Sequence, residues 1–322
     1  MSLRRRSFAL AGGALAAAPF VGGGAAVARQ TGYGKTRSGA DTWYRVRWLD
    51  HAQRERDITF AVPTAEIEAG ARIFRQFSMD DMRQRIEAAM RETASKWTST
   101  TLVIDKRTQA NPNALTISYQ LRGSSGEGLV EARRQIDAAI DAARARYAQG
   151  YLRRIDGQIL SVDYQAAARR YVAVMNPLAH ALARISDGLD ERGRVALALS
   201  LFQAIPYDEL SDRVRNGGTD FAPPPVLFEI NRGDCDSKSL ALGCVLRALA
   251  PSRAVAMATM PGHAILAIDM PAASGDAWMR GGGRVYVAME AAGPAMAPPG
   301  RVAPRTAPYL DRASFTLWPL GG

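Results

Sequence analysis

The segment that most constrains this chain of 322 residues is Gly-Asp-Cys-Asp-Ser-Lys-Ser at residues 233–239, which leads into a helical run at residues 240–249. A glycine turn followed by a cysteine in the first helical turn places a thiol at a helix N-terminus. The unpaired backbone N–H groups and the helix dipole favour the thiolate there. We expect Asp234 or Ser237 to cap this end. The apolar residues of the run form one stripe that anchors the helix in a core: Leu240, Ala241, Cys244, Val245, Ala248 and Leu249.

A thiolate nucleophile needs a base, and the chain contains three histidines. His180 lies in an apolar helical run, which favours a packed or surface role, and His51 follows a strand with nothing reactive beside it in sequence. His263 differs, because Pro261-Gly262 turns the chain and residues 263–268 then have the pattern of a buried strand. We therefore expect His263, the first residue of that strand, to face a neighbouring helix end.

A carboxylate is the third group that such a site requires, because it orients the imidazole. Glu290 ends a further strand-like segment, residues 284–290. Cysteine, histidine and carboxylate on a helix, a strand and an adjacent strand follow the logic of a nucleophilic triad. Two rival acids fit less well: Asp269 lies about 20 Å along the strand from His263, and Asp276 lies in a Gly- and Ser-containing loop, where a solvated role is expected.

These segments resemble the three motifs of the bacterial transglutaminase-like cysteine peptidases: residues 232–240, 261–264 and 286–290. The resemblance spans residues 203–300, about a third of the chain. It implies an α+β fold with a papain-like core, in which the cysteine-bearing helix packs on an antiparallel sheet that carries the histidine and the acid. The acid is commonly aspartate in that superfamily and is Glu290 here.

The resemblance also implies a thiol hydrolase or acyltransferase that acts on amide bonds of proteins or peptides, with hydrolysis by a cysteine peptidase favoured. Cys235 is then the nucleophile, His263 the base and Glu290 the orienting acid, and no metal or organic cofactor is implied. The Cys235 N–H and Gln203, in a Gln-x-x-Pro-Tyr segment, are the expected oxyanion donors, although a glutamine at an exposed helix end is an alternative for Gln203. Two other functions stay open: a protein-crosslinking transglutaminase, and an inactive module that binds an envelope protein.

Cys235 and Cys244 have different expected roles. A cysteine in a helix is most often a small buried apolar residue, and Cys244 fits that description. Nine residues of helix rise about 13 Å and end on the opposite face, so the two cysteines cannot form a disulfide within one helix.

The N-terminal residues 1–28 contain three arginines, no acid, and an apolar stretch that ends in Ala26-Val27-Ala28. This pattern predicts a secretory signal peptide of the twin-arginine type, cleaved after Ala28. A retained membrane anchor is the alternative, but the stretch is short and weakly apolar. We expect a periplasmic or secreted protein without stable membrane insertion, whose substrate is a protein or peptide of the cell envelope.

The net charge and the hydrophobic periodicity bear on the partners and the domain organisation of the chain. The formal net charge is +10, but the arginines are spread along helices without an aromatic-interleaved cluster, so a nucleic-acid partner is not expected. Beyond the signal, the chain divides into a flexible leader at residues 29–40, an α+β region of undetermined role at 41–160, and the catalytic domain with a helical lead-in at 161–322. Periodicity within residues 41–160 predicts strands at 42–48, 57–62, 101–106 and 115–121, and helices from Ser78 and over 127–151.

Overall fold

The structure is a computed structural model that describes residues 29–105, 109–111, 114–123, 126–156, 159–211 and 220–321. The described chain has mixed α+β structure, and every paired strand in it is antiparallel. It divides into two compact units. One comprises residues 76–163, and the other combines residues 29–75 with residues 164–321. The expected signal peptide lies outside the described residues.

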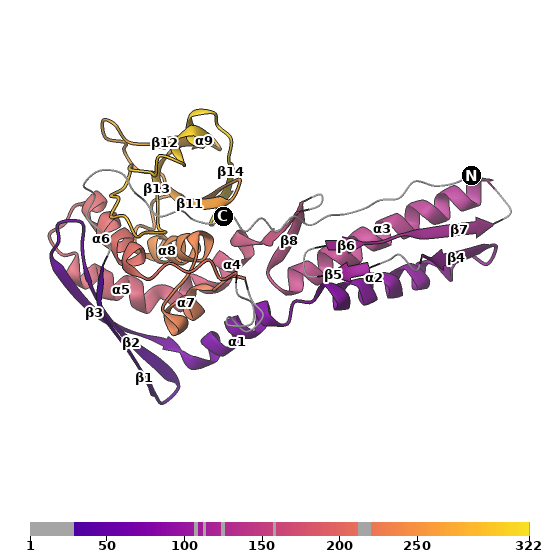
Figure 1. The fold of residues 1–322 in the computed structure, drawn as a ribbon, viewed down its shortest axis with the longest axis horizontal. Helices are drawn as coiled ribbons and strands as arrows, with labels where there is room; N and C mark the ends of the chain where they lie inside the picture. The colour runs from indigo at the N-terminus through magenta and orange to yellow at the C-terminus, as the bar shows by residue number, and fades with distance from the viewer. Residues whose placement is uncertain are drawn as a thin grey trace. The chain divides into compact units, whose positions relative to one another are not determined.

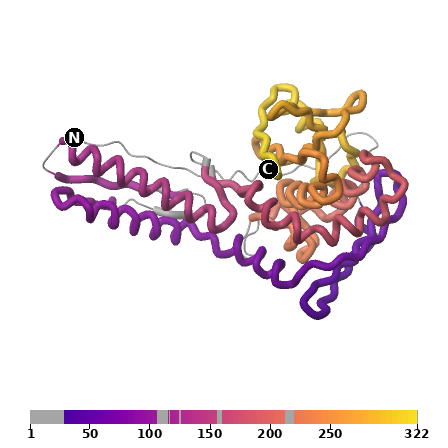
Figure 2. Tube along the Cα trace, turned by 180° about the vertical axis from the view of Figure 1, so that it is seen from behind, coloured from indigo at the N-terminus to yellow at the C-terminus, as the bar shows by residue number. Residues whose placement is uncertain are grey.

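The unit of residues 76–163 is built on two long helices, α2 (Met79–Ala94) and α3 (Gly126–Gly150), which lie side by side in both views (Figures 1 and 2). Ser78 caps α2, because its hydroxyl accepts a hydrogen bond from the N–H of Asp81 at 3.3 Å. The capped helix start that the sequence predicted is therefore confirmed. Short two-stranded ribbons accompany the helices: β4 (Thr100–Ile104) with β7 (Tyr119–Gly123), β5 (Gln109–Asn111) with β6 (Ala114–Thr116), and β8 (Arg153–Asp156) with β9 (Ile159–Val162).

The core cluster of this unit is apolar, although Arg144 and Arg153 are also buried in the same unit. Its buried core includes Met82, Ile86, Met90, Ile136 and Ile140, which repeat at helical spacing along α2 and α3. Each helix therefore buries one apolar face.

The second unit begins with a three-stranded meander, β1 (Gln30–Ser38), β2 (Asp41–Leu49) and β3 (Glu55–Pro63), which leads into α1 (Thr64–Arg75). After residues 76–163 the chain continues through α4 (Tyr164–Tyr171), a 3₁₀ turn η1 (Ala173–Met175), α5 (Asn176–Ile185), α6 (Glu191–Ala204) and α7 (Pro224–Ile230) to α8 (Cys235–Leu249). The expectation that residues 41–160 form one region is therefore wrong, because residues 41–75 pack with the C-terminal residues.

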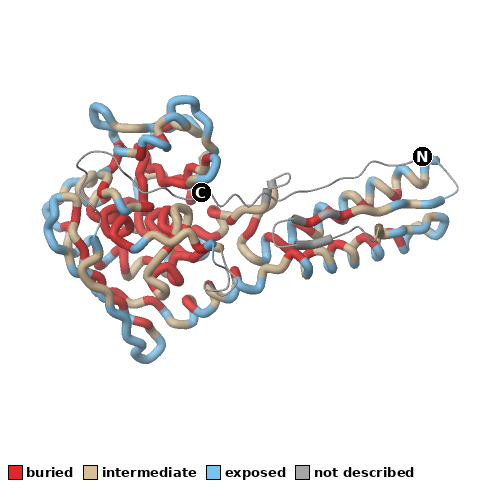
Figure 3. The backbone as a smooth tube through the Cα atoms, viewed as in Figure 1, coloured by how far each residue is buried: buried red, intermediate tan, exposed pale blue. Residues whose placement is uncertain are grey.

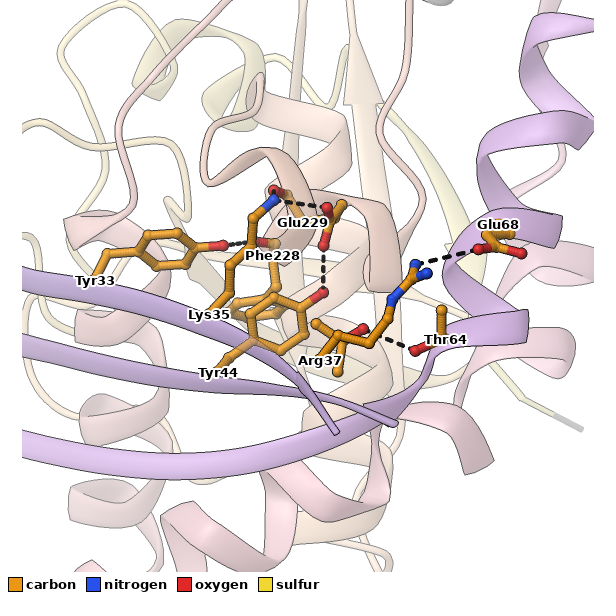
Figure 4. A network of polar contacts seen from close by, with 9 residues as sticks. Tyr33, Lys35, Arg37, Tyr44, Thr64, Glu68, Phe228 and Glu229 are labelled. Carbon is orange, nitrogen blue, oxygen red and sulfur yellow. Dashed lines mark hydrogen bonds and ion pairs between the residues drawn. The ribbon is translucent and has the colours of Figure 1, made fainter. Parts of the chain in front are cut away.

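The expected flexible leader at residues 29–40 is also wrong, since most of it forms β1. Its Gly, Lys and Ser content suggested mobility, but two of its side chains reach across to α7, as Figure 4 shows. The Tyr33 hydroxyl donates to the carbonyl of Phe228, and Lys35 Nζ donates to the carbonyl and to Oε1 of Glu229 at 3.0 and 2.6 Å. Tyr44 of β2 donates to the second oxygen of the same carboxylate at 2.9 Å. These distant partners order a strand whose own composition is weakly strand-forming.

The chain ends in a five-stranded antiparallel sheet of order β12–β13–β11–β10–β14. The strands are β10 (Val255–Met260), β11 (His263–Ile268), β12 (Trp278–Gly281), β13 (Arg284–Met289) and β14 (Thr316–Pro319), with a short helix α9 (Ala307–Asp311) before β14. Helix α8 packs on β10 and β11 and is covered elsewhere by α5, α6 and α7, so most of it is buried (Figure 3). At Gly243 an added Cβ would lie 2.4 Å from Leu320 Cδ1 and 3.1 Å from Leu266 Cδ1, so glycine lets α8 approach the sheet closely without displacing these side chains.

Candidate active site

Cys235 is the first residue of α8. The side chain of Asp234 caps the helix by accepting a hydrogen bond from the N–H of Ser237 at 3.1 Å, which is one of the two expected caps. The preceding Gly233 forms a parallel bridge with Tyr207, in the loop after α6. An added Cβ at Gly233 would lie 2.4 Å from Leu227 Cδ1, so glycine allows the chain to pass close to α7 as it enters the helix. The partly buried thiol thus stands at a well-anchored helix N-terminus.

His263 is the first residue of β11 because the chain turns tightly just before it. Met260 of β10 pairs directly with His263, leaving a two-residue turn whose second residue, Gly262, has a φ of +67°. Glu290 follows the last residue of β13, the strand that pairs with β11. His263 begins its strand as predicted, whereas Glu290 lies one residue beyond the end of β13 rather than within it.

The structure brings His263 and Glu290 together. His263 Nε2 lies 2.8 Å from Glu290 Oε2, and both side chains are more than nine-tenths buried. The other carboxylate oxygen, Oε1, accepts from the Thr306 hydroxyl at 2.5 Å and from the N–H of Ala303 at 3.3 Å. A carboxylate can only accept, so Nε2 of the imidazole carries the hydrogen and Nδ1 is left as the basic nitrogen.

The electrostatics of Glu290 keep it ionised. Burial pushes its pKa upward, but the hydrogen bond and charge of His263, together with the bonds from Thr306 and Ala303, outweigh burial and hold the pKa below its usual range. Glu290 is thus a fixed negative partner for an imidazole that becomes protonated.

The thiol of Cys235 lies against the start of β11, where the backbone N–H of Ala264 interacts with it. Burial raises the pKa of the thiol, and the carboxylates of Asp236 and Asp234 raise it further, whereas the Ala264 N–H lowers it. The sequence led us to expect a thiolate favoured by the helix N-terminus. In the structure the neutral thiol is favoured instead, because the sulfur is largely desolvated and two carboxylates flank it.

Gln203 is not placed as the oxyanion donor that its position in the sequence predicted. It is buried at 1% exposure, and its Nε2 donates to the carbonyl oxygens of Glu290 and Ala297 at 2.8 and 2.7 Å. Both amide hydrogens are therefore engaged with the backbone. Gln203 instead joins the end of α6 to the segment that carries Glu290.

His51 takes part in this arrangement through a residue that is distant in sequence, although nothing reactive lies beside it in the sequence. Because the Gln203 nitrogen donates twice, its Oε1 is an acceptor, and it lies 2.9 Å from His51 Nε2. Burial lowers the pKa of His51, so the neutral ring is the donor. The turn that holds His51 is fixed by Asp50, which accepts from the N–H of Ala52 and from the guanidinium of Arg56, each at 2.8 Å.

The residues set aside in the sequence have other partners. Asp269 pairs with Arg284 at 2.6 Å and Asp276 with Arg192 at 2.9 Å, and His180 lies exposed on α5. Cys244 is fully buried, and burial raises the pKa of its thiol to about 12, which makes it an unreactive core residue as predicted.

Three groups near the site were missed by sequence analysis: His51, Thr306 and Lys238. Each acts through a partner far away in the chain, so no local spacing identifies it. The sequence gives no signal for Lys238 either, because it lies between Ser237 and Ser239 in the polar start of the helix.

Comparisons with protein-family models, with curated proteins and with solved structures gave no match. Within the described ranges, no group of three or more histidine, cysteine, aspartate or glutamate side chains is arranged to hold a metal ion. No helix in that same part of the chain combines the length and apolar character needed to cross a membrane.

Proposed function

We propose that this protein is an exported thiol hydrolase that cleaves amide bonds of envelope proteins or peptides, built on a transglutaminase-like, papain-type core. The observation that carries the proposal is the buried His263–Glu290 pair, at 2.8 Å, beside the start of the helix that bears Cys235. A neutral imidazole oriented by a carboxylate is what a thiol nucleophile needs as a base. The twin-arginine pattern within residues 1–28 supports export.

In the proposed reaction His263 Nδ1 takes the proton from Cys235 Sγ as the sulfur attacks the amide carbonyl carbon. The C–N bond then breaks, and the imidazolium returns the proton to the leaving nitrogen, which departs as an amine. Water, deprotonated by the same nitrogen, attacks the thioester and releases the acid and the thiol. Glu290 stabilises the imidazolium in both halves, and the raised pKa of Cys235 favours base-assisted attack over a preformed ion pair.

The oxyanion requires donors other than Gln203. The Cys235 backbone N–H lies at the helix N-terminus, where it has no partner within the helix. Tyr207 offers a hydroxyl, and its location is consistent with that role. Tyr207 pairs with Gly233, two residues before Cys235, and burial together with the charges of Cys235 and Asp234 raises the pKa of its hydroxyl.

The test is labelling with iodoacetamide, together with hydrolysis of a peptide library derived from envelope proteins. We expect Cys235→Ala to abolish both readouts, and His263→Ala to slow labelling and abolish hydrolysis. Cys244→Ala is the matched control and should behave as wild type, because Cys244 is fully buried.

The same experiments distinguish the hydrolase from the two alternative functions, the envelope-binding module and the crosslinking transglutaminase. Labelling of Cys235 that does not depend on His263, without hydrolysis, would refute the hydrolase and favour the envelope-binding module. Incorporation of a biotinylated amine into glutamine-containing acceptors, exceeding hydrolysis, would favour the crosslinking transglutaminase.

A further inference from the structure

Lys238 is a lysine without any exposed surface, on the same helix as the nucleophile and three residues after it. Residues three apart on a helix are neighbours on one face, so the side chain starts beside Cys235. Burying an ammonium group is costly unless it is satisfied by hydrogen bonds. An apolar side chain such as methionine would fill the same space without that cost, so the choice of lysine calls for an explanation.

The Lys238 ammonium binds two segments that flank the site. Its Nζ donates to the carbonyl of Ile205 at 2.5 Å and to that of Ala292 at 2.8 Å. Ile205 is the C-cap of α6, where the helix dipole favours a positive charge, and it leads into Pro206-Tyr207. Ala292 lies two residues after Glu290. One side chain therefore holds the nucleophile helix, the Tyr207 loop and the segment of the acid together.

The charges around Lys238 come from the start of its own helix and from that loop. The groups that face its ammonium are Asp234 and Cys235, which both act on its charge, and Tyr207, whose ring centroid lies 6.0 Å from Nζ. The segment after β13 presents the Ala292 carbonyl. Among the described residues no carboxylate forms an ion pair with Nζ, and the charges of Asp234 and Cys235 both favour the ammonium form of Lys238.

We propose that Lys238 is a positioning residue whose buried ammonium joins the two segments flanking Cys235 and supports the thiolate form of that cysteine. It is the positive charge that opposes the two aspartates beside the sulfur. That Lys238 contributes to catalysis rests on the proposed function, in which Cys235 is the nucleophile. Burial lowers the pKa of Lys238 to about 7, although Asp234 and Cys235 raise it, so this support should be strong below neutral pH and fade above it.

The experiment measures the rate constant for iodoacetamide alkylation of Cys235 from pH 5.5 to 10 in wild type, Lys238→Met and Ser239→Ala, with Cys244 replaced by alanine throughout. Ser239 is the matched control, because it lies on the same helix and its fully buried hydroxyl has no hydrogen-bond partner in the described part of the chain. We expect wild type to react about tenfold faster than Lys238→Met at pH 6, the equivalent of one pKa unit of the thiol. The two rates should converge above pH 8, and Ser239→Ala should follow wild type throughout.

A ratio of wild-type to Lys238→Met rates that stays constant across this pH range would overturn the proposal, because lost packing alone slows the reaction equally at every pH. If Lys238→Met does not fold, Lys238→Arg serves instead: its guanidinium stays charged from pH 5.5 to 10, so its rate should match wild type at pH 6 and exceed it above pH 8, and a Lys238→Arg profile with the same change near pH 7 as wild type would refute the proposal. Alkylation requires no substrate turnover. Alkylation can therefore contradict the role of Lys238 while hydrolysis still depends on His263. Conversely, hydrolysis can be absent while alkylation still shows the effect of Lys238.

Discussion

The unit of residues 76–163 and the unit that holds the candidate site use the same kinds of element but fill their interiors differently. The first buries an apolar stripe from each of two long helices, and its fully buried core residues are methionines, isoleucines and alanines. The second buries four polar side chains of the candidate site: Gln203, Lys238, Glu290 and Thr306. Gln203 and Lys238 donate to backbone carbonyls, and the Glu290 carboxylate accepts from Thr306 and pairs with His263. Buried polar groups cost free energy unless they are fully bonded. The buried polar residues of the second unit therefore fix the geometry of the candidate site at a cost in folding stability.

The largest expected effect comes from Glu290→Gln. The amide keeps the size of the side chain but removes the negative charge that stabilises protonated His263, and an amide nitrogen facing Nε2 favours the wrong tautomer. We expect hydrolysis to fall about 10³-fold with little change in folding, by analogy with the loss of an orienting acid in triads. Single-turnover rates of wild type and Glu290→Gln measure the effect, and a fall of less than tenfold would remove Glu290 from the proposed triad.

Glu290→Gln should also change how the free energy of unfolding depends on pH. The folded-state pKa of Glu290 lies below its ordinary value of 4.5, so its contribution is present above pH 4.5 and is lost as the pH falls through the lower folded-state value. Between pH 5 and pH 3, wild type should therefore lose more unfolding free energy than Glu290→Gln. Denaturant titrations at a series of pH values test this, and parallel losses in the two proteins would contradict it.

The next largest effect is expected in the unit of residues 76–163. Ile136→Ala removes a fully buried side chain from the α2–α3 core, which should destabilise residues 76–163 by about 3 kcal/mol. Alkylation of Cys235 should stay unchanged, because the two units have separate cores. Hydrogen exchange resolved by peptide would show faster exchange confined to residues 76–163, and Ile136→Val is the milder control. Equal acceleration in α8 would show that the two units unfold as one.

A smaller effect is expected from Gln203→Leu, which leaves the carbonyls of Glu290 and Ala297 without their donor. We expect a loss of about 2 kcal/mol in stability for the unsatisfied groups and a roughly tenfold fall in kcat with KM little changed, because Glu290 is less well held. His51→Phe is the graded control: it removes only the partner of Gln203 Oε1 and should cost less in both readouts. Gln203→Leu with a wild-type kcat would show that Gln203 serves stability alone.

These two units also differ in how far their sequences predict them. The helix start at Ser78 was predicted correctly, since the cap depends on residues three positions apart. The positions of Cys235, His263 and Glu290 at the ends of their elements followed from turns and strand patterns that are equally local.

Contacts across long stretches of chain were the ones that sequence analysis missed. Gln203 and His51 are 152 positions apart, and β1 is ordered by α7 nearly 200 residues later. Neither local propensity nor spacing encodes such partners. Gln203 was therefore assigned to the oxyanion and residues 29–40 to a leader, although both are held by residues that only the folded chain brings near.

The smallest effect sharpens the contrast between local and distant contacts. Ser78→Ala removes the hydroxyl that accepts from the N–H of Asp81, and the loss of such a cap should cost about 1 kcal/mol. Ser78→Thr retains the acceptor and should cost much less. Because the cap stabilises only the first turn of α2, faster hydrogen exchange should be confined to residues 79–82 and leave α8 unchanged. A loss in Ser78→Thr as large as in Ser78→Ala would show that packing around residue 78, rather than the cap, fixes the start of this helix.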